Sequence, residues 1–307
     1  MRVADQFLFG YDDGHRLLAG SRELPGATAL ALLEATDAAI AQDAGPLVTG
    51  LALRERGEYA FCVTWSAPEA PRPGAVWAHA LIVGEGELDD PALDVLIGLP
   101  RCPPPGAGDF SEYLTPLELE GVVPAAPGYL PARALDRSLL ERLALHAYGS
   151  ANDPVVVHDE LADAANVMLA LWRAQWPALR AAFSFRTREI VREGPSEFDL
   201  TVARKVRGLR TEDPPGDRPA PAWLNQVADD AAAAAPKPLR DWLLTFGPLE
   251  PPEPSRLAAL AALWTAVVAR DAAAARTQLE REWPAEHAGK ALKRVLFARE
   301  NDDWWSG

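Results

Sequence analysis

The residues best suited to acid–base chemistry lie near the N-terminus, where Asp12 and His15 flank an Asp-Gly dipeptide at positions 13 and 14. Asp-Gly favours a two-residue hairpin turn because both positions of that turn need positive φ. The pattern predicts a hairpin in which Asp12 stands opposite His15 and Tyr11 opposite Arg16, with about 5 Å between paired Cβ atoms. A carboxylate beside an imidazole could perform acid–base catalysis. The alternative is a rigid polar turn without chemistry.

A second histidine, His79, falls in the alternating row Trp77, His79, Leu81 and Val83 of a predicted strand. Such a histidine is expected to form hydrogen bonds inside the core, because an unpaired buried polar group costs about 1–3 kcal/mol. The alternative is that Asp12, His15 and His79 meet in space as a catalytic or metal site. No HExxH, HxH or clustered Cys/His spacing occurs, so no metal site is predicted.

The standard phosphate-binding and nucleophile motifs are missing from the sequence. It contains no GxxxxGK[ST] loop, no GxGxxG after a strand and no GxSxG elbow. We therefore expect no nucleotide hydrolysis by this chain alone and no cofactor.

Charge and apolar patterning exclude several classes of partner. The net charge of −14 repels the phosphates of nucleic acids and anionic lipids. The longest apolar run, 257–269, is too short for a bilayer, which needs about 20 such residues. Cys62 and Cys102 form no disulfide framework and the N-terminus lacks a signal-peptide pattern, so we expect a cytoplasmic protein.

The elements that would position these residues predict an α+β protein. Proline-rich stretches suggest an N-terminal α+β domain (1–133), a mixed, mainly helical middle domain (134–247) and a helical C-terminal segment (248–307). Alternating patterns predict strands at 6–12, 15–21, 47–54, 59–65, 76–83, 155–157 and 198–206. Helical spacing predicts helices at 28–43, capped by Thr28, and at 135–148, 160–183 and 255–282, the last capped by Ser255. The strands at 47–83 should form an antiparallel meander, covered on one face by the first helix.

Three segments resemble a bacterial family, the GTPase-associated proteins. QFLFGYDDGHRLLAGS (6–21) is similar to the opening motif of the family's N-terminal domain of the first type. YAFCVTWSAPEAPRPGAVWAHALIV (59–83) resembles the later signature of that domain. LWRAQWPALRAAFSFRTRE (171–189) is similar to a motif of the domain that follows it. Longer members carry a large C-terminal portion, for which we expect no counterpart in this sequence.

The resemblance implies a non-enzymatic adaptor or scaffold in bacterial conflict (antiviral defence) systems, encoded with a GTPase and effector proteins. The alternative is a hydrolase or nucleotide-processing enzyme that uses Asp12, His15 and His79. Arg72, between two prolines, is either a solvated loop residue or an arginine finger offered to a partner GTPase. Adjacent tryptophans near a chain end would waste apolar area in water. The residues expected to bind a protein partner are therefore Tyr11, Asp13, Arg16, Arg72, Trp304 and Trp305.

Overall fold

The structure is a computed structural model of the chain. It describes residues 2–38, 40, 45–123, 127–130, 134–149, 155–192, 197–207, 220–233, 235, 237–284 and 289–298. The predicted docking residues Trp304 and Trp305 lie outside the described residues.

Nine strands in the described residues form one sheet. They are β1 (Val3–Tyr11), β2 (His15–Gly20), β3 (Leu47–Leu53), β4 (Glu58–Ser66), β5 (Val76–Gly84), β6 (Leu117–Glu118), β7 (Val155–Val157), β8 (Phe185–Arg192) and β9 (Leu200–Arg207). The strand order is β2-β1-β5-β4-β3-β8-β9-β7, and β6 pairs with β1. Pairing is antiparallel from β2 to β8, whereas β9 is parallel to both β8 and β7. The α+β fold class and the meander β3-β4-β5 are confirmed.

The N-terminal hairpin is present, but its predicted register is wrong. His15 pairs with Tyr11, and Arg16 pairs with Gly10. The turn therefore contains three residues, 12–14, instead of two. Asp13 and Gly14 do take positive φ, 54° and 134°. The Asp12 N–H donates to the Gly14 carbonyl at 2.9 Å, so Asp12 belongs to the turn and has no partner in the strand ladder.

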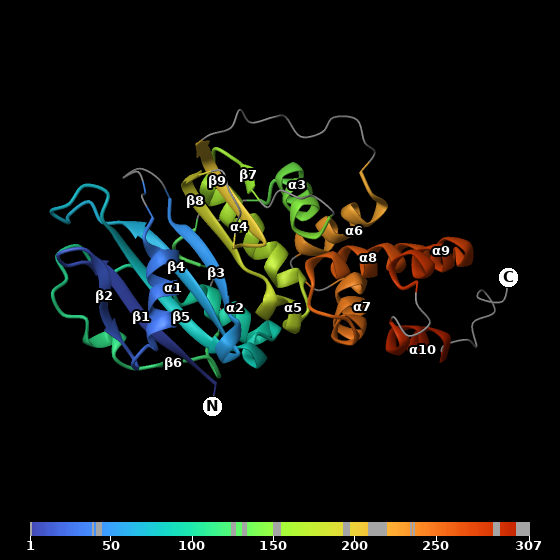
Figure 1. The fold of residues 1–307 in the computed structure, drawn as a ribbon, viewed down its shortest axis with the longest axis horizontal. Helices are drawn as coiled ribbons and strands as arrows, with labels where there is room; N and C mark the ends of the chain where they lie inside the picture. Colours follow the sequence, from blue (N-terminus) through green and yellow to red (C-terminus); the bar gives the residue numbers. More distant parts are fainter. Residues whose placement is uncertain are drawn as a thin grey trace.

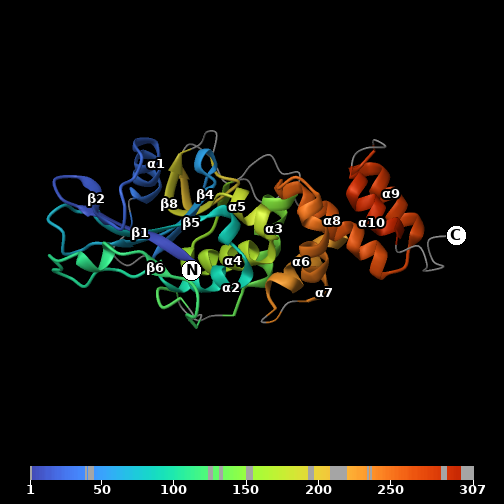
Figure 2. The same ribbon diagram turned by 90° about the horizontal axis from the view of Figure 1, so that it is seen from below.

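Helices cover both faces of the sheet (Figures 1 and 2). Helix α1 (Gly26–Thr36) lies on one face, where Leu32 packs with Phe7 and Phe9. It begins after Pro25 and not at Thr28, and it ends earlier than predicted. Helix α4 (Leu161–Ala174) lies on the other face, where Trp172 stacks on Tyr59 with ring centroids 5.1 Å apart. The predicted covering helix is thus confirmed, and α4 adds a second layer.

The chain beyond the meander is rich in helices, and those after residue 220 extend the molecule away from the sheet in Figure 2. They are α2 (Asp90–Gly98), α3 (Arg137–Tyr148), α5 (Pro177–Ala182), α6 (Ala222–Ala231), α7 (Pro238–Phe246), α8 (Pro254–Val268), α9 (Ala272–Glu282) and α10 (Lys290–Ala298). Short 3₁₀ helices occur at Arg54–Arg56, Glu85–Glu87, Ser111–Tyr113 and Gly247–Leu249.

Two predicted helices are each divided in two. The segment 160–183 breaks before Pro177, which starts α5 at a position where its missing N–H costs nothing. The segment 255–282 breaks at Arg270, whose φ of 54° reverses the chain between α8 and α9. Ser255 lies inside the first turn of α8, and the N-cap is Glu253.

The sheet also runs across the predicted domain boundary at 133/134. Gly50 of β3 pairs with Phe185 of β8, so strands from both sides of the boundary share one ladder. The division into three units remains a prediction.

Candidate functional site

The topology brings several connections to one end of the sheet. Phe9 near the end of β1 pairs with Ala78 near the start of β5, and Ser66 at the end of β4 pairs with Val76. Leu47 at the start of β3 pairs with Thr64. We call this region the loop end and define it as residues 11–16, 36–38 and 66–76 (Figure 1). It contains four of the predicted partner-binding residues: Tyr11, Asp13, Arg16 and Arg72.

The hairpin tip presents polar side chains to solvent. Asp12, Asp13 and Arg16 are exposed, and Tyr11 is half-buried. Asp12 forms an ion pair with Arg16 in place of the predicted pairing with His15. Exposed ion pairs of this kind contribute about 0–1 kcal/mol to stability. The tip is therefore a surface whose side chains can change partners at little cost to the fold.

His15 connects the hairpin to the end of α1. The Thr36 hydroxyl donates to the Leu32 carbonyl at 2.8 Å, so its oxygen accepts from His15 Nε2–H at 2.9 Å. The ring also stacks on Phe9. Burial lowers the pKa of His15, and the Asp37 carboxylate opposes that shift. The acidic neighbour that influences His15 is thus Asp37, which the sequence reasoning did not consider.

A residue that the sequence reasoning missed, Arg188 of β8, also contacts this end of α1. Its Nη2 donates to the carbonyls of Glu34 at 3.3 Å and Asp37 at 3.4 Å. A cation here offsets the negative end of the helix dipole. Burial lowers the pKa of Arg188. Because β8 was not predicted as a strand, no sequence pattern linked Arg188 to the hairpin.

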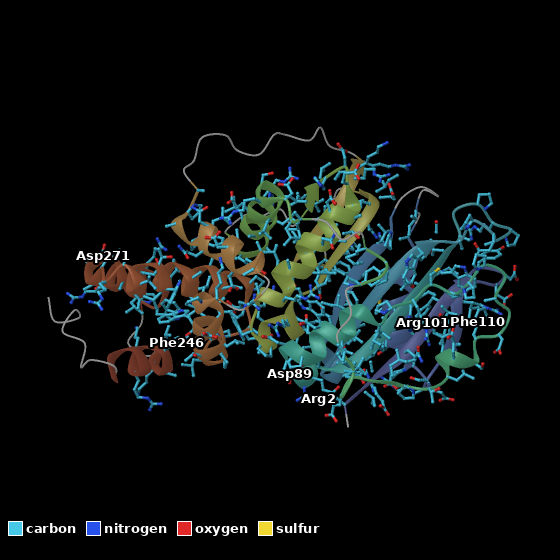
Figure 3. All side chains as sticks on the ribbon, turned by 180° about the vertical axis from the view of Figure 1, so that it is seen from behind. Arg2, Asp89, Arg101, Phe110, Phe246 and Asp271 are labelled. Carbon is cyan, nitrogen blue, oxygen red and sulfur yellow. The ribbon has the colours of Figure 1, made fainter. Side chains whose placement is uncertain are left out.

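His79 is enclosed on the opposite face of the sheet and is fully buried. Its Nδ1 accepts from the Arg101 N–H at 3.1 Å, so Nε2 carries the proton and donates to Gln6 Oε1 at 3.1 Å. The Gln6 amide in turn donates to the carbonyls of Glu112 and Thr115. Figure 3 labels Arg101 on the segment that crosses this face. Burial lowers the pKa of His79 to about 3, so the ring is neutral in the folded chain.

The structure does not bring Asp12, His15 and His79 together. His79 pairs across the sheet with Leu8, whereas His15 pairs with Tyr11. Leu8 and Tyr11 are three positions apart, so their side chains point to opposite faces. Moreover, both ring nitrogens of His79 are already engaged within the core. The geometry supplies no site shared by these three side chains.

Two further features, a metal centre and a membrane-spanning helix, were sought among the described residues. Within it, no group of three or more His, Cys, Asp or Glu side chains is arranged to hold a metal ion. None of the described helices has the length and apolar character needed to cross a membrane.

Comparison with known proteins identifies a family for the N-terminal part. Residues 3–96, about a third of the chain, match the family model of GTPase-associated protein 1, N-terminal domain type 1. They include the hairpin, α1, the meander and most of α2. No curated protein and no solved structure matches the chain significantly. The match supports, for residues 3–96, the family that the motifs at 6–21 and 59–83 indicate: the GTPase-associated proteins with an N-terminal domain of the first type.

Proposed function

We propose that this protein is a non-enzymatic adaptor that binds a GTPase through the loop end of its sheet. The observation that carries the proposal is the clustering of Tyr11, Asp13, Arg16 and Arg72 at one end of the domain that matches the GTPase-associated family. The first three belong to the β1–β2 hairpin and Arg72 to the β4–β5 connection, and all four are exposed or half-buried. Loops held by a rigid sheet are the usual carriers of recognition.

The setting is a bacterial conflict system in the cytoplasm, as the family resemblance and the unpaired Cys62 and Cys102 suggest. The partner is a GTPase or effector protein encoded near this chain. The net charge of −14 argues against nucleic acid as the ligand. The alternative, a hydrolase that uses Asp12, His15 and His79, has less support because the two histidines lie on opposite faces of the sheet.

Charge reversal at the hairpin tip tests this proposal. We expect Arg16→Glu to weaken binding of the GTPase encoded nearest to the gene at least about tenfold, since a like-charge contact in an interface costs several kcal/mol. The melting temperature should be almost unchanged, because Arg16 is exposed and its ion pair contributes little. Biolayer interferometry with the immobilised full chain measures the affinity.

The matched control is Arg281→Glu on α9. Arg281 is also exposed and paired with one carboxylate, Glu282, but it lies far along the chain from the loop end. This variant should bind as the unaltered chain does. Equal affinities for the Arg16 and Arg281 variants would contradict the assignment of the loop end, and a wild-type chain that fails to bind the GTPase would contradict the adaptor function.

A further inference from the structure

The β4–β5 connection is a stiff loop closed by its own hydrogen bonds. The Ala67 N–H donates to the Ala75 carbonyl at 2.9 Å and closes the loop at its base. Within it, the Ala70 N–H donates to the Ala67 carbonyl and the Ala75 N–H to the Arg72 carbonyl, both at 3.1 Å. The second turn has Pro73 at its second position and Gly74, with φ 78°, at its third, the pattern of a type II turn.

The loop is also attached to the sheet at its side. Trp77 Nε1 of β5 donates to Glu69 Oε1 at 2.5 Å. Three prolines, at positions 68, 71 and 73, restrict the backbone further. Arg72 is therefore presented on a framework that loses little conformational freedom when the guanidinium binds a ligand.

Arg72 borders a small cavity beneath the loop. The cavity has a volume of about 130 Å³ and is lined by Ile40, Ser66, residues 67–68 and residues 70–75. Among these lining residues, Arg72 is the one charged side chain, and the Ser66 hydroxyl is a second possible donor. Pockets for whole organic ligands measure roughly 300–1,000 Å³, so this one has room only for a small group.

The charge of Arg72 is not compensated by the described residues. Several other exposed arginines of this acidic chain pair with carboxylates, as Arg16 does with Asp12 and Arg137 with Asp229. For Arg72, no carboxylate of the described residues lies within ion-pair distance. Its planar guanidinium matches the geometry of phosphate oxygens.

We propose that the cavity under residues 66–75 binds a phosphate group, with Arg72 as its principal ligand. The site goes beyond the adaptor function and does not depend on it, because the loop would bind the anion without a protein partner. Two sources share this chemistry: free inorganic phosphate and the phosphates of a nucleotide.

The test is a titration of the ¹⁵N-labelled full chain, followed by the NMR signals of the Gly74 and Ala75 amides. Sodium phosphate and GDP are compared with sodium chloride at equal ionic strength. We expect saturable shifts with phosphate or GDP and none with chloride. Arg72→Gln should weaken the apparent affinity about tenfold or more, because a charge-assisted bidentate contact is lost. Arg270→Gln, which removes an exposed charge elsewhere, should bind like the unaltered chain.

The two sources give different results in this titration. Tighter binding of GDP than of phosphate would assign the site to a nucleotide, and equal or weaker binding of GDP would assign it to free phosphate. Equal shifts with chloride, an absence of shifts, or an unchanged affinity in Arg72→Gln would each overturn the proposal.

Discussion

Replacing His79 with Ala is expected to lower the free energy of unfolding by about 3 kcal/mol, because the change leaves a buried donor and a buried acceptor unpaired. These groups are the Arg101 N–H and Gln6 Oε1. The same substitution removes the ring that packs edge-on against Tyr113. Urea unfolding of the full chain measures the loss.

His15→Ala provides the matched comparison for this prediction. Its ring is half-buried and has one hydrogen bond, to Thr36, so we expect a loss of about 1 kcal/mol. A larger loss for His15→Ala than for His79→Ala would contradict the assignment of His79 as the structural histidine.

The loss of stability caused by His79→Ala should also depend on pH, and it should become smaller as the pH falls. Burial lowers the pKa of His79 from 6.5 to about 3 in the folded chain. Between these values the unfolded chain binds a proton that the folded chain does not, so the stability of the unaltered chain falls as the pH falls below about 6.5. His79→Ala lacks this contribution. The difference in stability between the two chains should therefore shrink by about 2 kcal/mol between pH 7 and pH 5.

Removing the buried guanidinium of Arg180 should have the largest effect on the fold. Arg180 is fully buried, donates to the carbonyls of Leu88 at 2.9 Å and Arg173 at 2.6 Å, and pairs with Asp90. It thereby joins α5 to the segment that leads into α2. Arg180→Met should cost about 3–5 kcal/mol, because it leaves the Leu88 and Arg173 carbonyls without their donor, at about 1–3 kcal/mol each. Thermal unfolding by circular dichroism measures it.

Arg137→Met is the control for this variant. Arg137 pairs with two carboxylates, Glu141 and Asp229, but it lies at the surface, so a loss below about 1 kcal/mol is expected. Arg180→Met should also unfold in a single transition, because the sheet crosses the predicted boundary at 133/134. A loss as small as that of Arg137→Met would contradict the structural role of Arg180.

The strands with clear alternation were predictable from sequence. In β4, Tyr59, Phe61 and Val63 alternate toward the face of the sheet that α4 covers. The predicted segments agree with the bounds of β3, β4, β5 and β7 to within a residue or two. In contrast, β8 was missed because its core-facing positions include Thr187 and Glu189, which are buried but polar. The Thr187 hydroxyl accepts from the Val48 N–H, an interaction that hydrophobic alternation does not reveal.

Helix α2 was not predicted either, although its first residues carry a sequence signal for a helix start. The N-cap of α2 is Asp89, whose carboxylate accepts from the Ala92 N–H, and Pro91 lies in the first turn; together they form a recognisable helix start. The hairpin register could not be obtained from Asp-Gly alone, since both two-residue and three-residue turns place residues at positive φ. That one-residue difference pairs Asp12 with Arg16 and leaves His15 to contact α1.

Hydrogen–deuterium exchange of the full chain, alone and with the GTPase encoded nearest to its gene, tests the adaptor function most directly. We predict that GTPase binding slows exchange at the loop end, in residues 11–16 and 67–75, and leaves α8 and α9 unchanged. Slower exchange confined to the helices of the C-terminal segment, or no slowing anywhere, would contradict the account.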